Sequence, residues 1–326
     1  MDIRILRGSE VKALLPMAAC IDLMETTMIA VSEGRARLPL RSLMSVSSGG
    51  MMGNMPGYLA EPECFGVKLV SLFPNNAAAG FSSHLGLVLL FEPEHGRPVA
   101  MLDAAELTAI RTAAVSGLAT RLLAREDASD LAILGSGEQA RSHLEAMLAV
   151  RPIRRVRVWS RRRESAEAFA QAESARHGRL IEPVSEVKDA TAGADIICTV
   201  SKAREPILLG DWITPGAHLN VVGSSIATAA EIDTAAVKRS KFFVDYRDST
   251  IHEGGEYLQA LRDGAITSEH ILGEIGEVAN GSRAGRTDPK DITLYKSLGI
   301  AAEDLASAHY VLQQARAQGV GQTVNF

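Results

Sequence analysis

The chain has 326 residues, of which 46% are hydrophobic and 22% are charged, as is typical of a globular protein of about two domains. Its formal net charge of −5 gives no support for nucleic-acid binding, and no apolar run reaches the roughly 20 residues that span a bilayer. The first residues, MDIRILRGSEVKALL, lack the features of a signal peptide, so we expect a cytoplasmic protein without membrane partners. Cys20, Cys64 and Cys198 have no CxxC spacing and are expected to be small buried residues, with no metal bound.

The first third of the chain changes from a helical to a strand pattern. Residues 1–36 carry apolar side chains at helical spacing, interrupted by Pro16, and predict helices. Residues 37–102 contain short apolar runs separated by Gly, Pro and Asn, which predict strands. The stretch EPEHGRP at 92–98 is typical of a hairpin turn, and a long helix is predicted at 104–124.

From Asp130 onwards short apolar runs alternate with helical patterns, which predicts a parallel sheet covered on both faces. Residues 297–319 predict a last amphipathic helix. We therefore expect an α/β protein with a first domain at 1–117, completed by 301–326, and a nucleotide-type domain at 118–300. The candidate strands of the second domain are 131–134, 155–159, 195–200, 218–222 and 241–245.

The stretch LGSGEQA matches G-x-G-x-x-A at Gly135, Gly137 and Ala140, after a strand pattern and at the start of a helical one. Gly135 would make the tight turn, Gly137 would let the backbone approach a pyrophosphate, and Ala140 would let the helix pack close to the strand. The helix N-terminus would then offer N–H groups to the phosphates. The alternative interpretation is a plain glycine turn in an α/β domain.

The end of the second strand of this domain bears on the choice between NAD and NADP. An acidic residue there would bind the ribose 2′-hydroxyl and repel a 2′-phosphate. This chain has Ser160, Arg161 and Arg162 instead, followed by another arginine, which favours a 2′-phosphate. The alternative is that these arginines are the solvated start of a helix.

Basic residues near turns of the first domain are candidates for substrate binding. Lys68 lies inside an apolar strand pattern and Arg111 inside an apolar helix, where an unpaired charge would be costly. We expect the two to clamp a carboxylate, with Arg41 as a third candidate. His84 is a candidate proton donor. The alternatives are surface or salt-bridged cations and a structural histidine.

Several stretches together resemble the ornithine cyclodeaminase/mu-crystallin family. They are KLVSLFPNN, LDAAELTAIRTAAVSGLAT, LGSGEQA, PGAHLNVVGS, FFVD and GEIGEV, and they cover nearly the whole chain. The resemblance implies a Rossmann-type doubly wound parallel sheet plus an α+β substrate and dimerisation domain built from both chain ends. It also implies a homodimer and a substrate carboxylate held by Arg41, Lys68 and Arg111.

The same resemblance implies the cofactor contacts. These would come from the glycine turn, from the arginine-containing stretch after the second strand and from the loops after the strands at 195–200 and 218–222. The residues are Thr112, Gly135, Ser136, Gly137, Glu138, Gln139, Ser160, Arg161, Arg162, Thr199, Val200, Ser201, Val222, Gly223, Ser224 and Lys296.

One position separates two branches of this family. Cyclodeaminases and related alanine dehydrogenases carry an Asp in a G-x-D-x-P-G-K-x-E-L pattern, where this chain reads GSSIATAAEI and places Ser225. VWSR, LLFEP and LYKSLGIAAED, with Lys296 in place of an Asp, also resemble the ketimine reductase branch. An amine must lose a proton before it gives up hydride, whereas a reductase starts from an existing C=N bond, so the loss of that base is tolerable.

The expected function is therefore NAD(P)H-dependent reduction of a small cyclic ketimine carboxylate, Δ1-pyrroline-2-carboxylate or Δ1-piperideine-2-carboxylate, to the L-amino acid. Ser225 and the cations would bind this small-molecule substrate, and NADPH is expected to be preferred, with NADH possible. The alternatives are an ornithine cyclodeaminase or alanine-type dehydrogenase, and a catalytically idle protein that retains the cofactor. The identity of the imino acid, the physiological direction and the proton donor stay open.

Overall fold

The computed structural model describes residues 2–46, 49–73, 76–82 and 84–325. The chain forms two compact units, the first made of Met1–Thr112 with Ile300–Phe326 and the second of Ala113–Gly299. The first boundary lies inside the long helix α3, Ala104–Leu123, ahead of the predicted position at residue 117.

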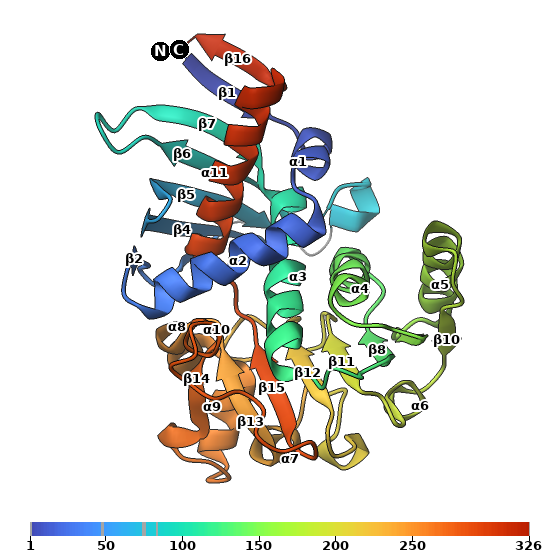
Figure 1. Ribbon diagram of the computed structural model, residues 1–326. Coiled ribbons are helices and arrows are strands. Elements are labelled where there is room, and N and C mark those ends of the chain that lie inside the picture. The colour runs from blue at the N-terminus through green and yellow to red at the C-terminus, as the bar shows by residue number, and fades with distance from the viewer. Residues whose placement is uncertain (1, 47–48, 74–75, 83, 326) are drawn as a thin grey trace. The chain divides into compact units, whose positions relative to one another are not determined.

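The first unit is built on an eight-stranded sheet with the order β16-β1-β7-β6-β5-β4-β2, in which β3 also pairs with β4 (Figure 1). β1 and β7 are parallel and the other neighbours are antiparallel. The predicted strands at 37–102 and the turn at 92–98, which joins β6 to β7, are confirmed. The strands are β1 Asp2–Leu6, β2 Ala36–Arg37, β3 Ser42–Ser45, β4 Met51–Ala60, β5 Glu63–Leu72, β6 His84–Phe91, β7 Pro98–Asp103 and β16 Gln322–Asn325.

The prediction of a helix from the first residue is wrong for Asp2–Leu6, which form β1. This segment alternates polar and apolar residues and pairs with β16 from the other end of the chain, a partner that local periodicity cannot reveal. Helices α1, Gly8–Leu14, and α2, Met17–Ser32, follow as predicted. Pro16 separates them as the N-cap of α2.

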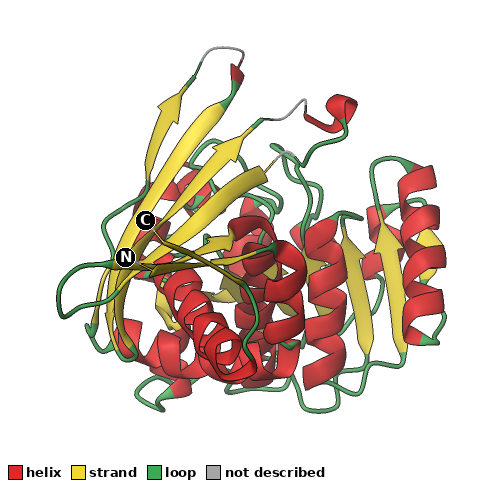
Figure 2. Ribbon diagram, turned by 90° about the horizontal axis from the view of Figure 1, so that it is seen from above, coloured by secondary structure: helices red, strands yellow, loops and turns green. Residues whose placement is uncertain are grey.

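Helix α11, Ala301–Gln318, packs on strands β4, β5 and β6, and α2 packs on α11 (Figures 1 and 2). The close approach depends on glycine: a Cβ at Gly57 of β4 would lie 3.0 Å from Ala301, and one at Gly66 of β5 would lie 3.0 Å from Leu305. Gly319 ends the helix with φ of +68°, a conformation that favours glycine. This packing brings the start of the last helix onto the strand that carries Lys68.

The second unit contains an eight-stranded sheet whose strands are all parallel, in the order β10-β9-β8-β11-β12-β15-β13-β14. The chain goes out from β8 to one side of the sheet and returns to β11 on the other, the doubly wound arrangement of the predicted Rossmann-type fold. The strands are β8 Asp130–Leu134, β9 Arg155–Trp159, β10 Glu182–Val184, β11 Ile196–Thr199, β12 His218–Val221, β13 Ser240–Val244, β14 Ile271–Glu274 and β15 Ile292–Lys296.

All five strands predicted for this unit are present, whereas β10, β14 and β15 were not predicted. β15 inserts between β12 and β13, although it follows both in the chain. Figure 2 shows helices lying along this parallel sheet. The helices after β8 are α4 Glu138–Val150, α5 Arg163–His177, α6 Val187–Thr191, α7 Thr234–Arg239, α8 Arg247–Glu253, α9 Gly255–Arg262 and α10 Ile275–Ala279. Short 3-10 turns occur at Asn76–Ala79 in the first unit and at Gly210–Trp212 and Ser268–His270 in the second.

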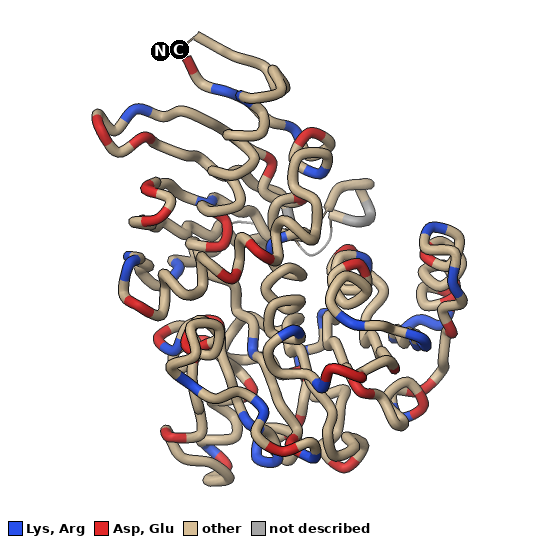
Figure 3. Tube along the Cα trace, in the orientation of Figure 1, with Lys and Arg blue, Asp and Glu red and all other residues tan. Residues whose placement is uncertain are grey.

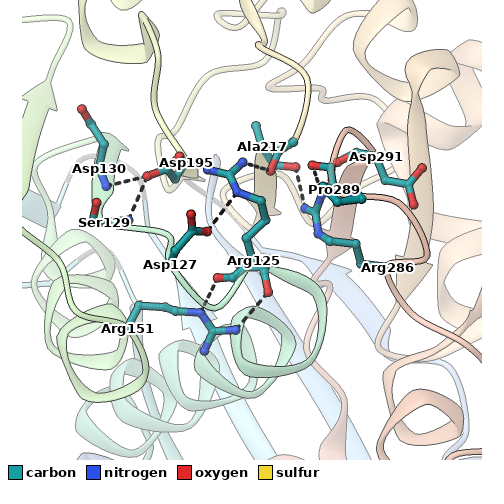
Figure 4. A network of polar contacts seen from close by, with 12 residues as sticks. Arg125, Asp127, Ser129, Asp130, Arg151, Asp195, Ala217, Arg286, Pro289 and Asp291 are labelled. Carbon is teal, nitrogen blue, oxygen red and sulfur yellow. Dashed lines mark hydrogen bonds and ion pairs between the residues drawn. The ribbon is translucent and has the colours of Figure 1, made fainter.

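Arginines hold the carboxyl end of α3 in the second unit (Figure 4). Arg151 donates hydrogen bonds to the carbonyl oxygens of Thr120, at 2.9 Å, and of Arg125, at 2.8 Å. Arg125 donates to the carbonyl oxygen of Gly216 at 2.8 Å and pairs with Asp195 at 2.5 Å. Arg151 also donates to the carbonyl oxygens of Arg121 and Ala124, each at 3.0 Å, and contacts of this kind satisfy carbonyl groups at a helix end. Arg151 therefore has a structural role.

Lys and Arg are interspersed with Asp and Glu along both units (Figure 3). Among the described residues, no single helix is long and apolar enough to cross a membrane. One helix pair, Gly8–Leu14 with Met17–Ser32, passes that test by length and composition together, but it is bent by 81°.

Candidate functional site

The predicted dinucleotide turn joins β8 to α4. Gly135 has φ of +137°, a conformation that side chains rarely adopt, and a Cβ there would lie 2.6 Å from the carbonyl oxygen of Val200. Glycine is therefore required both by the turn and by the backbone that follows β11.

Gly137 is the N-cap of α4, and no side chain caps this helix end. A Cβ at Gly137 would have no described atom within 4 Å, whereas Ala140 is fully buried. The buried Oε1 of Gln139 has no hydrogen-bond partner among the described residues. Free helix N–H groups beside open space fit an anion such as a pyrophosphate. Ser136 and Glu138 belong to the same turn, and their contact with a cofactor stays a prediction.

The residues after β9 fit the ribose end of a dinucleotide. Ser136 Oγ donates a hydrogen bond to Ser160 Oγ at 3.0 Å, so the glycine turn and the end of β9 are adjacent. Arg161 and Arg162 are exposed and form no ion pair with any residue that the structure describes. The connection from β9 to α5 contains no carboxylate that would repel a 2′-phosphate.

The remaining predicted cofactor residues lie where β11, β12 and β15 end, at the same edge of the sheet. They are Thr199, Val200, Ser201, Val222, Gly223, Ser224 and Lys296. Two backbone hydrogen bonds, from Val222 N at 3.0 Å and from Gly223 N at 3.1 Å, reach the Thr199 carbonyl oxygen and join the two loops. Lys296 is fully buried, donates to the Ser224 carbonyl oxygen at 2.5 Å and pairs with Glu256 at 3.0 Å. A direct contact between Lys296 and a cofactor stays a prediction.

The first unit buries a cluster of four charged side chains. Lys68 on β5 donates a hydrogen bond from Nζ to Asp304 Oδ1 at 3.1 Å, and Arg111 on α3 donates from Nε to the same oxygen at 2.9 Å. Arg111 also pairs with Glu303 through Nη1. Lys68 is 5% exposed, Arg111 is 3% exposed, and both carboxylates are fully buried. Two cations are therefore balanced by two carboxylates from the first turn of α11.

Burial sets the protonation of this cluster. The pKa of Lys68 is lowered to about 8, first by desolvation and then by the Arg111 charge, while Asp304 opposes the change. Burial alone would lower the pKa of Arg111, but Asp304 and Glu303 more than offset it and raise the pKa. Lys68 therefore loses its proton at a lower pH than an ordinary lysine, with a pKa of about 8, and Arg111 stays charged.

The structure brings Lys68 and Arg111 together as predicted, but as salt-bridged residues, the alternative that the sequence left open. Arg41 is half-buried and directly precedes β3. Ser225 is half-buried in the loop after β12, and Thr112 is buried on α3. The roles of these three residues in binding stay predictions. His84 begins β6, but its side chain lies outside the part that the structure describes.

Two other expectations concern metals and cysteines. Cys20, Cys64 and Cys198 are free and buried. Glu92, Glu94 and His95 place potential ligand atoms within 4.8 Å of one another at the turn between β6 and β7. However, Glu92 accepts backbone hydrogen bonds from its own turn, including one from Glu94 at 2.8 Å. Its carboxylate thus has a structural role.

Comparison with known proteins decides the family. The model of the ornithine cyclodeaminase/mu-crystallin family matches residues 1–319. The chain belongs to this family. The resemblance seen in the sequence is thereby confirmed, and so is the fold class.

Three known proteins illustrate what this chain is similar to. Ketimine reductase mu-crystallin of Mus musculus is 37% identical over 280 residues, 86% of this chain and 85% of that protein. The structure of Thermococcus litoralis Δ1-pyrroline-2-carboxylate reductase in complex with NADH and L-proline is 36% identical, with a TM-score of 0.96 over 99% of this chain and all of that one. An archaeal alanine dehydrogenase dimer with bound NAD is 30% identical, with a TM-score of 0.94 over the whole of both chains.

Sequence reasoning missed the carboxylates of this family member's two buried networks. Glu303 and Asp304 contact the cations of the first unit, and Glu231 and Glu256 contact the loops after β11 and β12. One signal was available: AAED places two acids at the start of an otherwise apolar helix pattern. Acids in a first turn usually serve the helix itself, so the pattern does not reveal which cations they face.

Proposed function

We propose that this protein reduces a small cyclic ketimine carboxylate, Δ1-pyrroline-2-carboxylate or Δ1-piperideine-2-carboxylate, with a reduced nicotinamide cofactor. The observation that carries the proposal is the buried pair of cations, Lys68 and Arg111, in a chain whose other unit contains a dinucleotide turn. The names of relatives at 36–37% identity, a ketimine reductase and a Δ1-pyrroline-2-carboxylate reductase, support the same reaction.

The two cations suit a substrate carboxylate. The contacts with Asp304 and Glu303 engage Nε and Nη1 of Arg111, whose guanidinium carries further N–H donors. The Lys68 ammonium has three N–H donors, and one of them is directed at Asp304. Arg111 and Lys68 thus retain donors for an incoming carboxylate, and their own carboxylates hold both in place before it arrives.

Lys68 is also the proposed proton donor. Reduction of a C=N bond adds a hydride to carbon and a proton to nitrogen, and a bound nicotinamide supplies the hydride. An ammonium with a pKa of about 8 is protonated at neutral pH and yet releases its proton readily. Arg111 cannot take this role, because its pKa is raised.

Ser225 favours reduction over amine oxidation. The cyclodeaminase branch has an Asp at this position, and a carboxylate can remove a proton from an amine before hydride leaves. A serine hydroxyl does not act as a base near neutral pH without an activating neighbour. The proposed direction is therefore from imine to amino acid.

For the cofactor we propose a preference for NADPH over NADH. The support is the connection Ser160–Arg162, which offers two exposed guanidinium groups and no carboxylate. Guanidinium groups bind phosphate by paired hydrogen bonds. The structure of the relative from Thermococcus litoralis is a complex with NADH, so we expect NADH to serve this protein as a weaker hydride donor.

A homodimer is proposed from the open face of the first sheet. Met44, Met52, Leu85 and Leu87 point to the same face of strands β3, β4 and β6, and are between 39% and 58% exposed. Exposed large apolar side chains that share one face of a sheet are typical of an interface. The alanine dehydrogenase relative is described as a dimer, which supports the same assembly.

The test is a panel of cyclic imines and open-chain oxo acids, assayed with NADPH and NADH by absorbance at 340 nm. We expect NADPH oxidation with at least one five- or six-membered cyclic imine carboxylate, and L-proline or L-pipecolate as product. Binding of NADPH without turnover of any imine would instead favour the idle cofactor-binding protein.

A further inference from the structure

The carboxylate of Glu231 lies between the two loops that follow β11 and β12. Its Oε1 accepts hydrogen bonds from Ser201 N at 2.7 Å and Ser201 Oγ at 2.6 Å. Its Oε2 accepts from Thr199 Oγ1 at 2.8 Å and from Gly223 N at 2.6 Å. One fully buried carboxylate thus binds both loops through four donors.

This arrangement leaves no room for change at Gly223. A Cβ there would lie 2.5 Å from Glu231 Oε1 and 2.2 Å from the Ser201 carbonyl oxygen. Burial raises the pKa of Glu231, whereas the Ser201 and Thr199 hydroxyls and the Lys296 charge oppose the rise. Burying a carboxylate is costly unless it is hydrogen-bonded. The four hydrogen bonds to the Glu231 carboxylate offset this cost and fix the local structure.

A second carboxylate extends the network to β15. Glu256 Oε1 accepts hydrogen bonds from Glu231 N at 3.0 Å and from the Ser224 hydroxyl, and Glu256 pairs with Lys296 at 3.0 Å. Lys296 in turn donates to Ser224 Oγ at 2.8 Å. The hydrogen bond from Glu231 N to Glu256 therefore fixes the backbone of Glu231. The network as a whole links the ends of the neighbouring strands β11, β12 and β15.

The position of these loops relates them to one half of a dinucleotide. In a doubly wound sheet the pyrophosphate sits at the first turn, here after β8, and the adenosine half extends towards the end of the second strand, here β9. The loops after β11 and β12 lie on the opposite side of the switch point and therefore face the nicotinamide half. The hydrogen bonds that the Glu231 carboxylate accepts come from this second group of loops.

We propose that Glu231 is a positioning residue that fixes the loops Thr199–Ser201 and Val222–Ser224 in the conformation that binds the nicotinamide half of the cofactor. This inference rests on the proposed function, because it requires a nicotinamide dinucleotide. It assigns no chemistry to Glu231 itself, which acts through the backbone and hydroxyl groups of the loops.

The experiment compares Glu231→Gln with wild type by calorimetric titration of NADPH and of adenosine 2′,5′-bisphosphate, which contains only the adenosine half. We expect the Kd of NADPH to rise at least about tenfold, the scale of lost charge-assisted hydrogen bonds, with less than about a twofold change for the bisphosphate. The KM for NADPH should rise in parallel. Glu205→Gln, an exposed acid of the same unit, is the matched control and should leave both affinities unchanged.

If Glu231 had a merely structural role, Glu231→Gln would weaken the binding of both ligands equally and lower the melting temperature, and this result would overturn the proposal. Wild-type affinity of the variant for both ligands would overturn it too. If Glu231→Gln does not fold, Thr199→Val and Ser201→Ala remove one contact each from the other side. Each should weaken NADPH selectively, and unchanged NADPH affinity in both would contradict the inference. Absence of NADPH and NADH binding by the wild type would contradict the proposed function instead, so the two failures are distinguishable.

Discussion

Asp304 Oδ1 accepts hydrogen bonds from Lys68 Nζ at 3.1 Å, although 236 positions separate the two residues. The contact joins the first turn of the last helix, α11, to the strand β5 near the start of the chain. Since Arg111 shares the same oxygen, one carboxylate orients both proposed substrate-binding cations. The proposed substrate site of the first unit therefore depends on both ends of the chain.

The first prediction concerns the pH dependence of imine reduction. Because protonated Lys68 is the proposed donor and its pKa is about 8, kcat/KM should be constant below that pH and fall as pH rises through it. Lys68→Met should cost at least about 2 kcal/mol in kcat/KM and abolish this fall. Lys68→Arg retains the charge but holds its proton more firmly. The alkaline fall of kcat/KM should therefore vanish in this variant, while substrate binding, measured by KM, is partly retained. A wild-type profile carried unchanged into Lys68→Met would exclude Lys68 as the donor.

The second prediction separates the two carboxylates of the cluster. Asp304 raises the pKa of Lys68 more than Glu303 does, so Asp304→Asn should move the alkaline fall of kcat/KM to lower pH, and Glu303→Gln should move it less. Both variants leave a buried cation with fewer partners, at a stability cost of about 3–5 kcal/mol. Initial rates measured from about pH 6 to about pH 10 check the shift of the pH profile, and chemical denaturation checks the loss of stability. A shift to higher pH in Asp304→Asn would contradict the assignment.

The third prediction tests the glycine turn. Gly137→Asp should abolish NADPH binding because it adds an anion where the pyrophosphate binds, while open space at this position leaves the fold intact. Gly135→Ala is the contrasting variant: its Cβ would meet the Val200 carbonyl oxygen, and φ is +137°, so stability itself should fall. Titration calorimetry and thermal melting distinguish the outcomes. Unchanged nucleotide affinity in Gly137→Asp would refute the assignment of the turn.

The fourth prediction tests the cofactor preference. Replacing both Arg161 and Arg162 by Ala should lower the affinity for NADPH by about tenfold or more and leave the affinity for NADH nearly unchanged, since only NADPH carries the 2′-phosphate. Arg163→Ala is the control, because Arg163 donates to Glu167 at 2.8 Å on its own helix. Equal loss of both cofactors, or none, would remove the basis for the NADPH preference.

Local sequence patterns predicted much of this structure. The alternation of short apolar runs with helical patterns predicted five of the parallel strands, and the spacing of the glycines predicted the dinucleotide turn. Both features depend on residues that are neighbours in the sequence. The strand β1 was mistaken for helix and β15 was not predicted, because β1 depends on β16 at the far end of the chain and β15 is a short run inserted between two earlier strands. Tertiary pairing, which a local window does not contain, decides both.

The candidate site was predictable to the same extent. A lysine inside an apolar strand indicates an anionic partner, and Lys68 has one. The pattern could not specify Asp304, because any acid in the chain satisfies the same requirement. Glu231 is a similar case: its spacing from Ser225 is plain in the sequence, whereas its contacts with Ser201 and Gly223 appear only when the strand ends are brought together.

We propose that Ser225, where a cyclodeaminase has an Asp, makes this chain a reductase and not a cyclodeaminase. The most direct measurement is the ratio of two activities in one preparation at pH 7: NADPH-dependent reduction of Δ1-pyrroline-2-carboxylate, and release of ammonia from L-ornithine with bound NAD(P). We expect kcat/KM for the imine to exceed that for ornithine by at least about a hundredfold, the scale of a missing general base. Vigorous conversion of ornithine to proline, with no reduction of either cyclic imine, would contradict it.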